Sequence, residues 1–324
     1  MEDPRFSSFL ARYPRYAAAY TALAARDPIL EQSARTVFRT QGNKLGVAAE
    51  NILQWVEFAY GTPSGERAAM AAGVETGAAS AAADAYVSRY VERVAALNAL
   101  QARFARAPSA ATLGAPGTHV ARDDYDIALL LSLVFSTHRF EILAALKAFL
   151  DFVRQPHGRF ASVGTGYELY VAQSRLEGYD TDPACRRGAQ RLLDFYRASA
   201  GVTPGAEFPL TSFDPSRAGA YDAIVLCELL EHLPDPLAAL TTTRRYLRPG
   251  GAMFVTMAIN IEQEDHLHLY PDVASCQTQI RDAGLEIVHE RALPVMLHEN
   301  MADAAPAPLF HGNYVAVVKA RAGA

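Results

Sequence analysis

The second half of the chain alternates short apolar segments with amphipathic ones, and this alternation narrows the choice of fold more than any other feature. From Arg159 onward, strand character is found at residues 159–163, 175–180, 206–210, 221–227, 251–257, 285–291 and 312–319. Helical periodicity lies between these strands at residues 167–173, 183–200, 235–247 and 271–283. Such alternation predicts a mostly parallel sheet with helices on both faces. No helical pattern separates the last two strands, so we expect the last strand to be antiparallel.

Residues 1–118 show only helical patterns. Apolar residues recur at three- and four-residue spacing over residues 5–26, 27–40, 44–60 and 84–104, and strand signals are absent. Residues 107–117, rich in Ala, Pro and Gly, have the composition of a linker. A further long helix or helix pair is expected from Asp124 to Arg154. We therefore predict a helical domain over residues 1–118, which caps a small-molecule site or forms a homodimer, and a second domain over residues 119–324.

Charge and cysteine content exclude several classes of protein. The 324 residues carry a formal net charge of -5 with no basic run, so we expect no nucleic-acid partner. The longest apolar run, from Ile127 to Phe135, is too short to span a bilayer, and the first residues are acidic where a signal peptide is basic. The three cysteines are far apart and odd in number. We therefore expect no disulfide framework, and we expect the protein to be cytoplasmic.

A glycine turn directly follows the first predicted strand. Gly164, Thr165 and Gly166 stand where the strand ends, and glycine lets a ligand lie against bare backbone. Asp180 closes the second strand, where a carboxylate accepts hydrogen bonds from ribose hydroxyls. These features outline a nucleoside-cofactor site, although two glycines after a strand also form ordinary tight turns.

Two further blocks follow in the chain. The strand at 221–227 ends in Cys227, Glu228 and Leu229, at the end of a strand where ligands bind in open α/β sheets. The block Leu247-Arg248-Pro249-Gly250-Gly251 has the composition that ends a helix and starts a strand.

With these blocks, residues 158–319 resemble a class I S-adenosylmethionine-dependent methyltransferase. The blocks are Val163-Gly164-Thr165-Gly166, Glu228-Leu229-Leu230-Glu231-His232 and Leu247-Arg248-Pro249-Gly250-Gly251, in the order and at about the spacing of the family. The resemblance implies a Rossmann-like seven-stranded sheet with helices on both faces and an antiparallel last strand. It also implies S-adenosylmethionine as cofactor and a catalytic role for the domain at 119–324, preceded by the all-α domain.

The resemblance further implies which residues contact the cofactor. Gly164, Thr165 and Gly166 would lie beneath its methionine part, and Asp180 would bind the ribose. Phe213 and Asp214 would flank the adenine, and Cys227, Glu228 and Leu229 would lie along the cofactor. Glu231 and His232 would be structural. The chain departs from the family pattern at Ser162, where an acid is usual, and at Glu168, where a third glycine is usual.

Methyl transfer from a sulfonium is an in-line displacement, so the protein mainly positions the acceptor and provides a base. The polar loop at residues 260–270 follows the fifth strand and is the expected place for these groups. Our catalytic candidates are Tyr167, Glu264, Asp265 and His266. Our candidates for substrate contacts are His138, Tyr170, Asn260 and Gln263. The acceptor is expected to be a small molecule, methylated on nitrogen or oxygen in secondary metabolism. We expect no metal, because the loop spacing of His266 and His268 implies no fixed geometry.

Two alternatives remain open from the sequence. Bacterial azetidine-2-carboxylate synthases resemble this layout, with a helical part before a methyltransferase-like domain, and they cyclise the cofactor itself and release methylthioadenosine. Tyr167 and Tyr170 offer aromatic faces that stabilise a sulfonium cation in either reaction. The other alternative is a non-catalytic binding or scaffold subunit.

Overall fold

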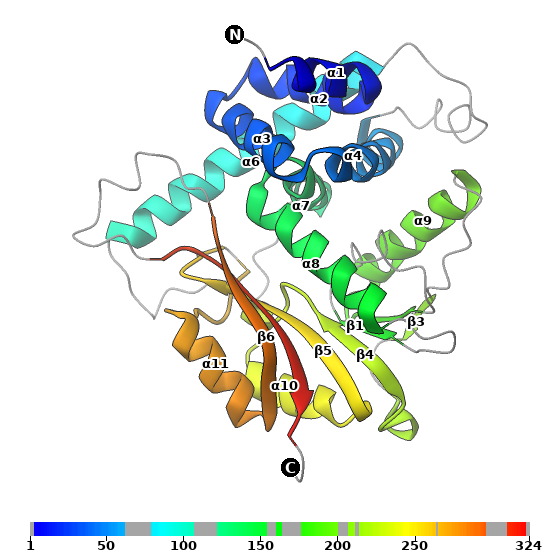
Figure 1. The fold of residues 1–324 in the computed structure, drawn as a ribbon, viewed down its shortest axis with the longest axis vertical. Coiled ribbons are helices and arrows are strands. Elements are labelled where there is room, and N and C mark those ends of the chain that lie inside the picture. Colours follow the sequence, from blue (N-terminus) through cyan, green and yellow to red (C-terminus); the bar gives the residue numbers. More distant parts are fainter. Residues whose placement is uncertain are drawn as a thin grey trace. The chain divides into compact units, whose positions relative to one another are not determined.

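The structure is a computed structural model of the chain, drawn as a ribbon in Figure 1. It describes residues 3–61, 79–106, 122–153, 160–163, 176–199, 207–210, 214–263, 265–295 and 310–321. Helices alone form the described residues before 154, and strands alternate with helices after 160. The mixed α/β class predicted from the sequence is therefore confirmed.

The strands of the second half form one sheet. They are β1 (Phe160–Val163), β2 (Leu176–Tyr179), β3 (Glu207–Leu210), β4 (Tyr221–Leu226), β5 (Leu247–Ile259), β6 (Leu285–Pro294) and β7 (Gly312–Ala320). Their order across the sheet is β3-β2-β1-β4-β5-β7-β6. Neighbouring strands from β3 to β5 are parallel, whereas β7 lies antiparallel to both β5 and β6, as predicted. Placing β7 between them covers β5 and leaves β6 as the edge strand.

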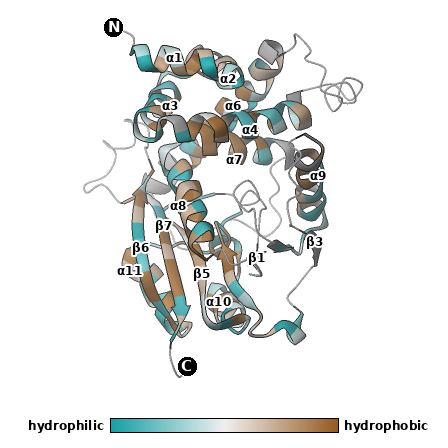
Figure 2. Cartoon of the chain, turned by 45° about the vertical axis from the view of Figure 1, so that its right-hand side comes forward, coloured by the Kyte–Doolittle hydropathy of each residue, from teal (hydrophilic) through white to brown (hydrophobic). Residues whose placement is uncertain are grey.

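The hydropathy of the last two strands matches their places in the sheet (Figure 2). Strand β7 is buried over most of its length, whereas most side chains of β6 are partly or fully exposed. Charged side chains such as Glu290 and Arg291 occupy β6. An edge strand exposes unpaired backbone groups, and charged side chains discourage pairing with another molecule.

Helices cover both faces of the central strands. The helices of this part of the chain are the end of α8 (Thr137–Val153), α9 (Pro183–Ser199), α10 (Pro236–Arg244) and α11 (Val273–Asp282), with the short 3-10 helices η3 (Pro215–Arg217) and η4 (Leu230–His232). Successive residues of a strand face opposite sides. Phe254 of β5 contacts Phe149 of α8, with ring centroids 5.7 Å apart, whereas Val255 belongs to a buried cluster with Leu240 of α10 and Ile280 of α11.

One predicted boundary in this region is wrong. The helix expected over 235–247 ends at Arg244, and β5 begins at Leu247, so the block 247–251 lies within the strand. Leu247 pairs with Tyr221 at the start of β4, and the ladder resumes with Ala252 opposite Ala223 after a register shift. Gly250 has a φ of 81°, which a residue with a side chain rarely adopts. The glycine turn is therefore an irregular start of the strand. The helix predicted at 167–173 lies outside the described residues.

A buried carboxylate lies near the amino-terminal end of the parallel strands. Glu177 of β2 accepts hydrogen bonds from the hydroxyls of Tyr221 (2.7 Å) and Tyr179 (3.3 Å) and pairs with Arg217. Burial alone would raise the pKa of Glu177, but the hydrogen bonds from Tyr221 and Arg217 outweigh it, and the pKa is lowered. This network joins β2, η3 and β4 at the end of the sheet opposite to the strand carboxyl termini.

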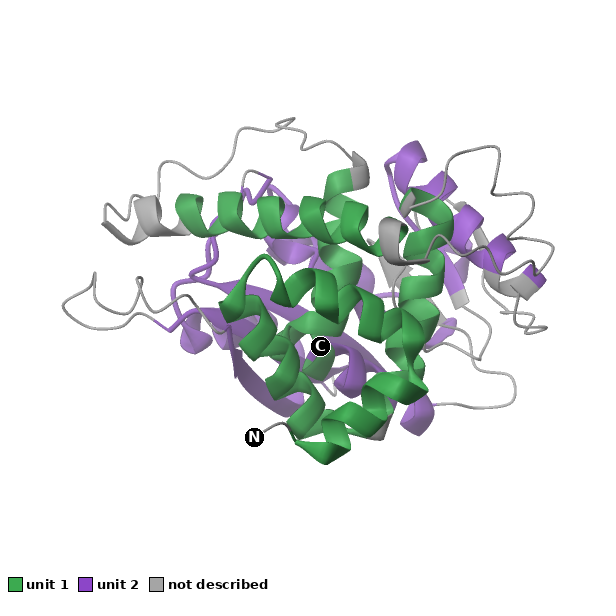
Figure 3. Cartoon of the chain, turned by 90° about the horizontal axis from the view of Figure 1, so that it is seen from above, with its two compact units in different colours: residues 1–103, 119–141, 296–302 green, residues 104–118, 142–295, 303–324 purple. Residues whose placement is uncertain are grey.

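The chain divides into two compact units, coloured separately in Figure 3. The first contains the described residues of 1–103 and 119–141, and the second contains residues 142–295 and β7. The division differs from the domain boundary predicted at residue 118, because residues 119–141 cluster with the N-terminal helices. Helix α8 runs across the division.

The first unit is all helical, as predicted. Its elements are α1 (Pro4–Arg12), α2 (Pro14–Ala24), α3 (Pro28–Gln41), α4 (Asn43–Val56), the π-helical turn η1 (Glu57–Gly61), α6 (Ala79–Arg106), α7 (Arg122–Phe135) and the start of α8. The single helix predicted over 5–26 is wrong: it breaks at Tyr13, because Pro14 cannot donate a backbone hydrogen bond and opens α2 instead. The long helix or helix pair predicted over 124–154 is a pair, with the break at Ser136.

The helical unit has an aromatic core. Phe9 lies between Tyr16 and Phe38, with ring centroids 5.1 Å and 4.9 Å away. The hydroxyl of buried Ser33 donates to the carbonyl of Phe135 at 2.7 Å, which satisfies a backbone acceptor at the end of α7.

No single helix among the described residues is long and apolar enough to cross a membrane. The segments Asp124–Phe135 and Thr137–Val153 reach that length and apolar content only as a pair, and they are bent by 83°.

Candidate active site

The carboxyl ends of four parallel strands meet at one edge of the sheet. Val163 of β1 pairs with Tyr179 of β2 on one side and with Leu226 of β4 on the other, and Leu226 pairs with Val255 of β5. Residues that follow these strands therefore lie along the same edge. The chain leaves β1 toward β2 and β3 and later returns through β4 toward β5, so the strand order reverses between β1 and β4. Ligands of open α/β sheets bind at such a reversal.

Asp180 follows β2 at this edge. Its carboxylate accepts a hydrogen bond from the backbone N–H of Asp182 at 2.8 Å. Its own carbonyl accepts from the guanidinium of Arg186 in α9. The side chain is only partly buried. The carboxylate is therefore oriented by the following turn and still reachable by solvent.

Asp214 precedes η3, next to the end of β3. Its carboxylate accepts a hydrogen bond from the backbone N–H of Ser216 at 2.9 Å, and this bond lowers the pKa of Asp214. The side chain is exposed. The acid is therefore ionised at neutral pH and has an oxygen facing solvent in addition to its capping role.

Glu228 follows β4 and has an unusual backbone. Its φ is 50°, a left-handed conformation that costs roughly 1 kcal/mol for a residue with a side chain. Asn313 of β7 donates to both carboxylate oxygens of Glu228, at 2.9 Å and 2.8 Å, and Thr256 of β5 donates at 2.6 Å. The Glu228 N–H in turn donates to the Thr256 hydroxyl at 2.6 Å. Two strands thus determine where this carboxylate points.

The other two residues predicted beside Glu228 differ in exposure. Cys227 is buried, with only 2% of its surface exposed. Its sulfur accepts a long contact of 3.7 Å from the Thr256 hydroxyl. Leu229 is partly buried and packs against the main hydrophobic cluster. Sequence reasoning missed Asn313 and Thr256, because each looks like an ordinary polar residue within an apolar strand.

The loop after β5 is held at its base by Asn260. This residue is only 5% exposed, and its backbone also has a left-handed conformation, with a φ of 52°. Its side-chain amide donates to the carbonyls of Pro271 (2.7 Å) and Phe310 (2.8 Å), and its own carbonyl lies 2.7 Å from Nδ1 of His311. Both amide hydrogens therefore position the loop. The substrate contact predicted for Asn260 is not favoured by this geometry.

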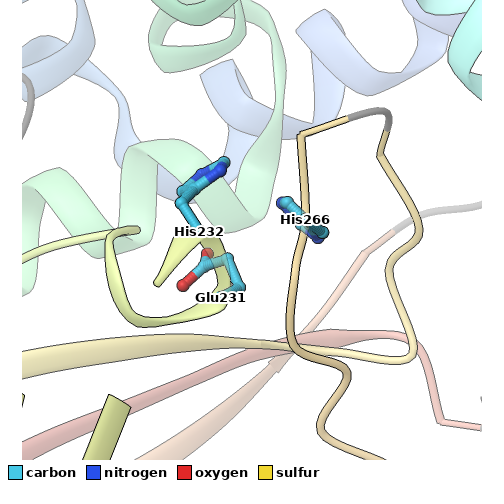
Figure 4. A group of neighbouring side chains, drawn as sticks. All are labelled: Glu231, His232 and His266. Atoms are coloured by element: carbon cyan, nitrogen blue, oxygen red, sulfur yellow. The ribbon is translucent and has the colours of Figure 1, made fainter. Parts of the chain in front are cut away.

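Three side chains from two loops come together above this edge (Figure 4). Glu231 and His232 lie in η4, after β4, and His266 lies in the loop after β5. One ligand atom from each lies within 4.8 Å of the others. Glu231 is 1% exposed and His266 is 2% exposed, whereas His232 is half-buried. The backbone N–H groups of Leu267 and His268 donate to the Glu231 carbonyl at 2.8 Å and 2.9 Å, which fixes one loop against the other.

Asp265 and Gln263 take part in the same loop contacts. A carboxylate oxygen of Asp265 lies 3.4 Å from Nδ1 of His232, and its side chain is 38% exposed. Gln263 is half-buried, and its carbonyl accepts the backbone N–H of His266 at 3.2 Å. The sequence named Asp265 and His266 as candidates but assigned Glu231 and His232 a structural role. The signal that could have joined them is their position after two neighbouring strands.

Several predicted site residues are not located by the structure. Those that lie outside the described residues are Gly164, Thr165, Gly166, Tyr167, Tyr170, Phe213 and Glu264. His138 belongs to the helical unit. These assignments stay predictions.

A comparison with known families assigns the chain to a class. The family model of the methyltransferase domain matches residues 135–299, just over half of the chain. The matched stretch contains β1 to β6, and therefore the ends of the four parallel strands described above, but not Asn313 of β7. The chain thus belongs to this family of methyltransferase domains. Membership confirms the predicted class and its cofactor, S-adenosylmethionine.

Individual relatives match only a short stretch. A ubiquinone biosynthesis O-methyltransferase from Marinobacter nauticus is 46% identical over 43 residues, which are 13% of this chain and 18% of that protein. The protein of the same name from Xanthomonas oryzae pv. oryzae is 42% identical over 40 residues, 12% of this chain and 17% of the relative. The chain therefore spans less than a fifth of the length of these relatives.

Solved structures of methyltransferases are similar over about half of the chain. One from Methanosarcina mazei has a TM-score of 0.42 at 15% identity, covering 54% of this chain and 98% of that one. The CcbJ methyltransferase from Streptomyces caelestis has a TM-score of 0.40 at 13% identity, covering 55% and 95%. With TM-scores below 0.5 they add nothing to the assignment, which depends on the family model.

Proposed function

We propose that the chain catalyses S-adenosylmethionine-dependent methylation of a small molecule, with a hydroxyl oxygen as the favoured acceptor. The observation that carries the proposal is the placement of Asp180 and Glu228 at the same edge of the sheet, on either side of the strand where the order reverses, within the stretch that the family model matches. The relatives named as O-methyltransferases, which match this chain over a short stretch, support oxygen over nitrogen. A role in secondary metabolism stays a prediction.

In this proposal Asp180 binds the ribose, Asp214 lies near the adenine, and Gly164 to Gly166 lie beneath the methionine part. The sheet described above is then the Rossmann-like methyltransferase sheet, and the cofactor binds within the unit that contains residues 142–295 and β7, which is the larger part of the domain predicted over 119–324. The helical residues 1–118 serve as a cap or as a dimer contact. The sequence pattern and the placement of Asp180 and Asp214 support these assignments.

The bound cofactor supplies a methyl group on a positively charged sulfur. A lone pair on the acceptor oxygen forms the new bond to carbon while the sulfur–carbon bond breaks, and its electron pair stays on sulfur as S-adenosylhomocysteine. The acceptor proton leaves to a base. Asp265 is our candidate for that base, because its carboxylate is partly exposed on the loop at this edge. His266 is buried and engaged within the loop, so we no longer assign it this role.

Mass spectrometry of the reaction products tests the proposal. The purified chain is incubated with S-adenosylmethionine alone, and then with a panel of phenols, catechols, amines and carboxylic acids. We expect S-adenosylhomocysteine only when an acceptor is present, with the largest yield from a hydroxyl compound.

Two other outcomes would replace this function with another. Methylthioadenosine formed without an acceptor would indicate cyclisation of the cofactor. Failure to bind either S-adenosylmethionine or S-adenosylhomocysteine in calorimetry would indicate a non-catalytic subunit.

A further inference from the structure

The side chains of Glu231, His232 and His266 lie close enough together to share one metal ion. Each residue offers one ligand atom, and these atoms lie within 4.8 Å of one another. All three belong to the same compact unit and to two loops that the Glu231 carbonyl holds together. Figure 4 shows the carboxylate and the His232 imidazole on one loop and the His266 imidazole beside them on the other.

In both imidazoles, Nδ1 lies within hydrogen-bond distance of a backbone carbonyl. Nδ1 of His266 lies 2.8 Å from the carbonyl of Ile261, and Nδ1 of His232 lies 3.1 Å from the carbonyl of Asp265. A carbonyl only accepts, so in both rings Nδ1 carries a hydrogen, and in the neutral form of such a ring Nε2 is the nitrogen with the free lone pair. Histidine ligands of metals are oriented in this way, with the non-ligating N–H donated to a carbonyl or carboxylate.

The burial of the Glu231 side chain is a third observation that favours a bound cation. Its side chain is 1% exposed. A carboxylate taken out of water is strongly destabilised unless positive charge or hydrogen bonds compensate it. A divalent cation held between this oxygen and two neutral imidazole nitrogens would stabilise the charge where it lies.

We propose that Glu231, His232 and His266 bind one divalent transition-metal ion. Two imidazole nitrogens and one carboxylate oxygen suit Zn²⁺, Mn²⁺, Fe²⁺ or Co²⁺, whereas Mg²⁺ prefers ligands that are all oxygen. Ligand atoms around one such ion lie about 3.3 Å apart at bond lengths of about 2.1 Å. Binding of the ion would therefore require the side chains to rotate toward it. The expectation of no metal, drawn from loop spacing, is replaced by this proposal.

The ion would have coordination positions that these three residues do not fill. Such positions bind water or an oxygen of another molecule. If the proposed methyl transfer is correct, the occupant is the acceptor hydroxyl, which the ion would orient and make more acidic. This last step depends on the proposed function, whereas binding of the ion does not.

Calorimetry on the full chain, with any affinity tag removed and residual metal stripped by a chelator, tests the site without cofactor or acceptor. We expect ZnCl₂ and MnCl₂ each to bind with one ion per chain, and MgCl₂ to bind more weakly. Added Co²⁺ should give the visible absorption of a site with nitrogen ligands.

Two variants weaken or remove one ligand while keeping the shape of the side chain close to that of the wild type. His266→Asn keeps a donor near the position of Nδ1, for the Ile261 carbonyl, and removes Nε2. Glu231→Gln keeps the shape and removes the charge. Each should weaken Zn²⁺ binding by at least about tenfold, since changes even to outer-shell partners cost 10–100-fold. His268→Asn is the matched control: His268 lies two residues away with its ring 4.8 Å from that of Tyr270, and binding should be unchanged.

The unfolding temperatures of the metal-free proteins must agree for the comparison to be valid, and Glu231→Gln alone suffices if His266→Asn is unstable. Absence of stoichiometric binding by the wild-type chain would overturn the proposal. So would equal affinities for the wild type and both ligand variants. Because no cofactor or acceptor is present, these results do not depend on whether the chain transfers methyl groups.

Discussion

The strongest test of the described edge is to exchange the amide and the carboxylate that meet there. Asn313 is fully buried, and its side-chain amide donates to both carboxylate oxygens of Glu228, at 2.9 Å and 2.8 Å. Asn313→Asp keeps the shape of the side chain but places a second carboxylate against Glu228. Two hydrogen bonds to a charged acceptor are lost, each worth about 1.5–3 kcal/mol. We therefore expect a loss of at least about 3 kcal/mol in the free energy of unfolding.

A second substitution tests whether that contact is responsible. Adding Glu228→Gln to Asn313→Asp restores an amide facing a carboxylate, with the donor now on the other strand, and the carbonyl of the new amide still accepts from Thr256. The double variant should regain at least half of the lost stability. Such coupling between two substitutions is the signature of direct contact.

The assay is thermal unfolding at pH 7, followed by circular dichroism. For a unit of 150–250 residues, 1 kcal/mol corresponds to about 2–4 °C, so the single variant should unfold about 6–12 °C below the wild type. A drop of less than 2 °C, or a double variant no more stable than the single one, would refute the inferred role of Asn313.

Three further predictions concern other parts of the chain. Asp180→Ala should weaken S-adenosylmethionine binding by at least about tenfold, through the loss of charge-assisted hydrogen bonds; calorimetry with the exposed-cap variant Asp235→Ala as control would contradict this if the two variants bound equally. Glu177→Gln should lower stability by about 2 kcal/mol at pH 7. Because the folded pKa of Glu177 lies below its ordinary value of 4.5, its contribution is present above pH 4.5 and disappears as the pH falls through the folded pKa, so the variant should show a flatter loss of stability in acid than the wild type. Ser33→Ala should lower stability by about 1–3 kcal/mol in urea unfolding, because it leaves a buried carbonyl without its donor, whereas Thr36→Ala, which removes a solvent-exposed hydrogen bond to the carbonyl of Gln32, should change it little.

Much of the fold was predictable from local patterns. Buried strands need apolar side chains on both faces, so residues such as 221–226 and 312–320 are apolar runs that stand out between helices. Helix starts carry their own caps, as where Asp27 accepts from the N–H groups of Ile29 and Leu30 before Pro28 opens α3. The methyltransferase class followed from three short blocks because backbone turns at the ends of strands need particular residues.

Local patterns were less reliable at boundaries. Apolar spacing continues through Tyr13 and Pro14, so periodicity alone joined two helices that proline separates. The glycines after Leu247 suggested a turn, yet pairing with β4 makes this segment part of β5. At Pro14 the missing backbone donor outweighed the apolar spacing. After Leu247 the pairing with β4 outweighed the glycine signal.

The sequence by itself determined the elements, the class and the position of Asp180 at the end of a strand, because each depends on residues close together in the chain. Only the tertiary structure joined Asn313 to Glu228, 85 residues apart, and His266 to Glu231 and His232. Those contacts depend on which strands are neighbours and how two loops pack. Strand order is decided by packing of the whole sheet, so no pattern within one segment contains it.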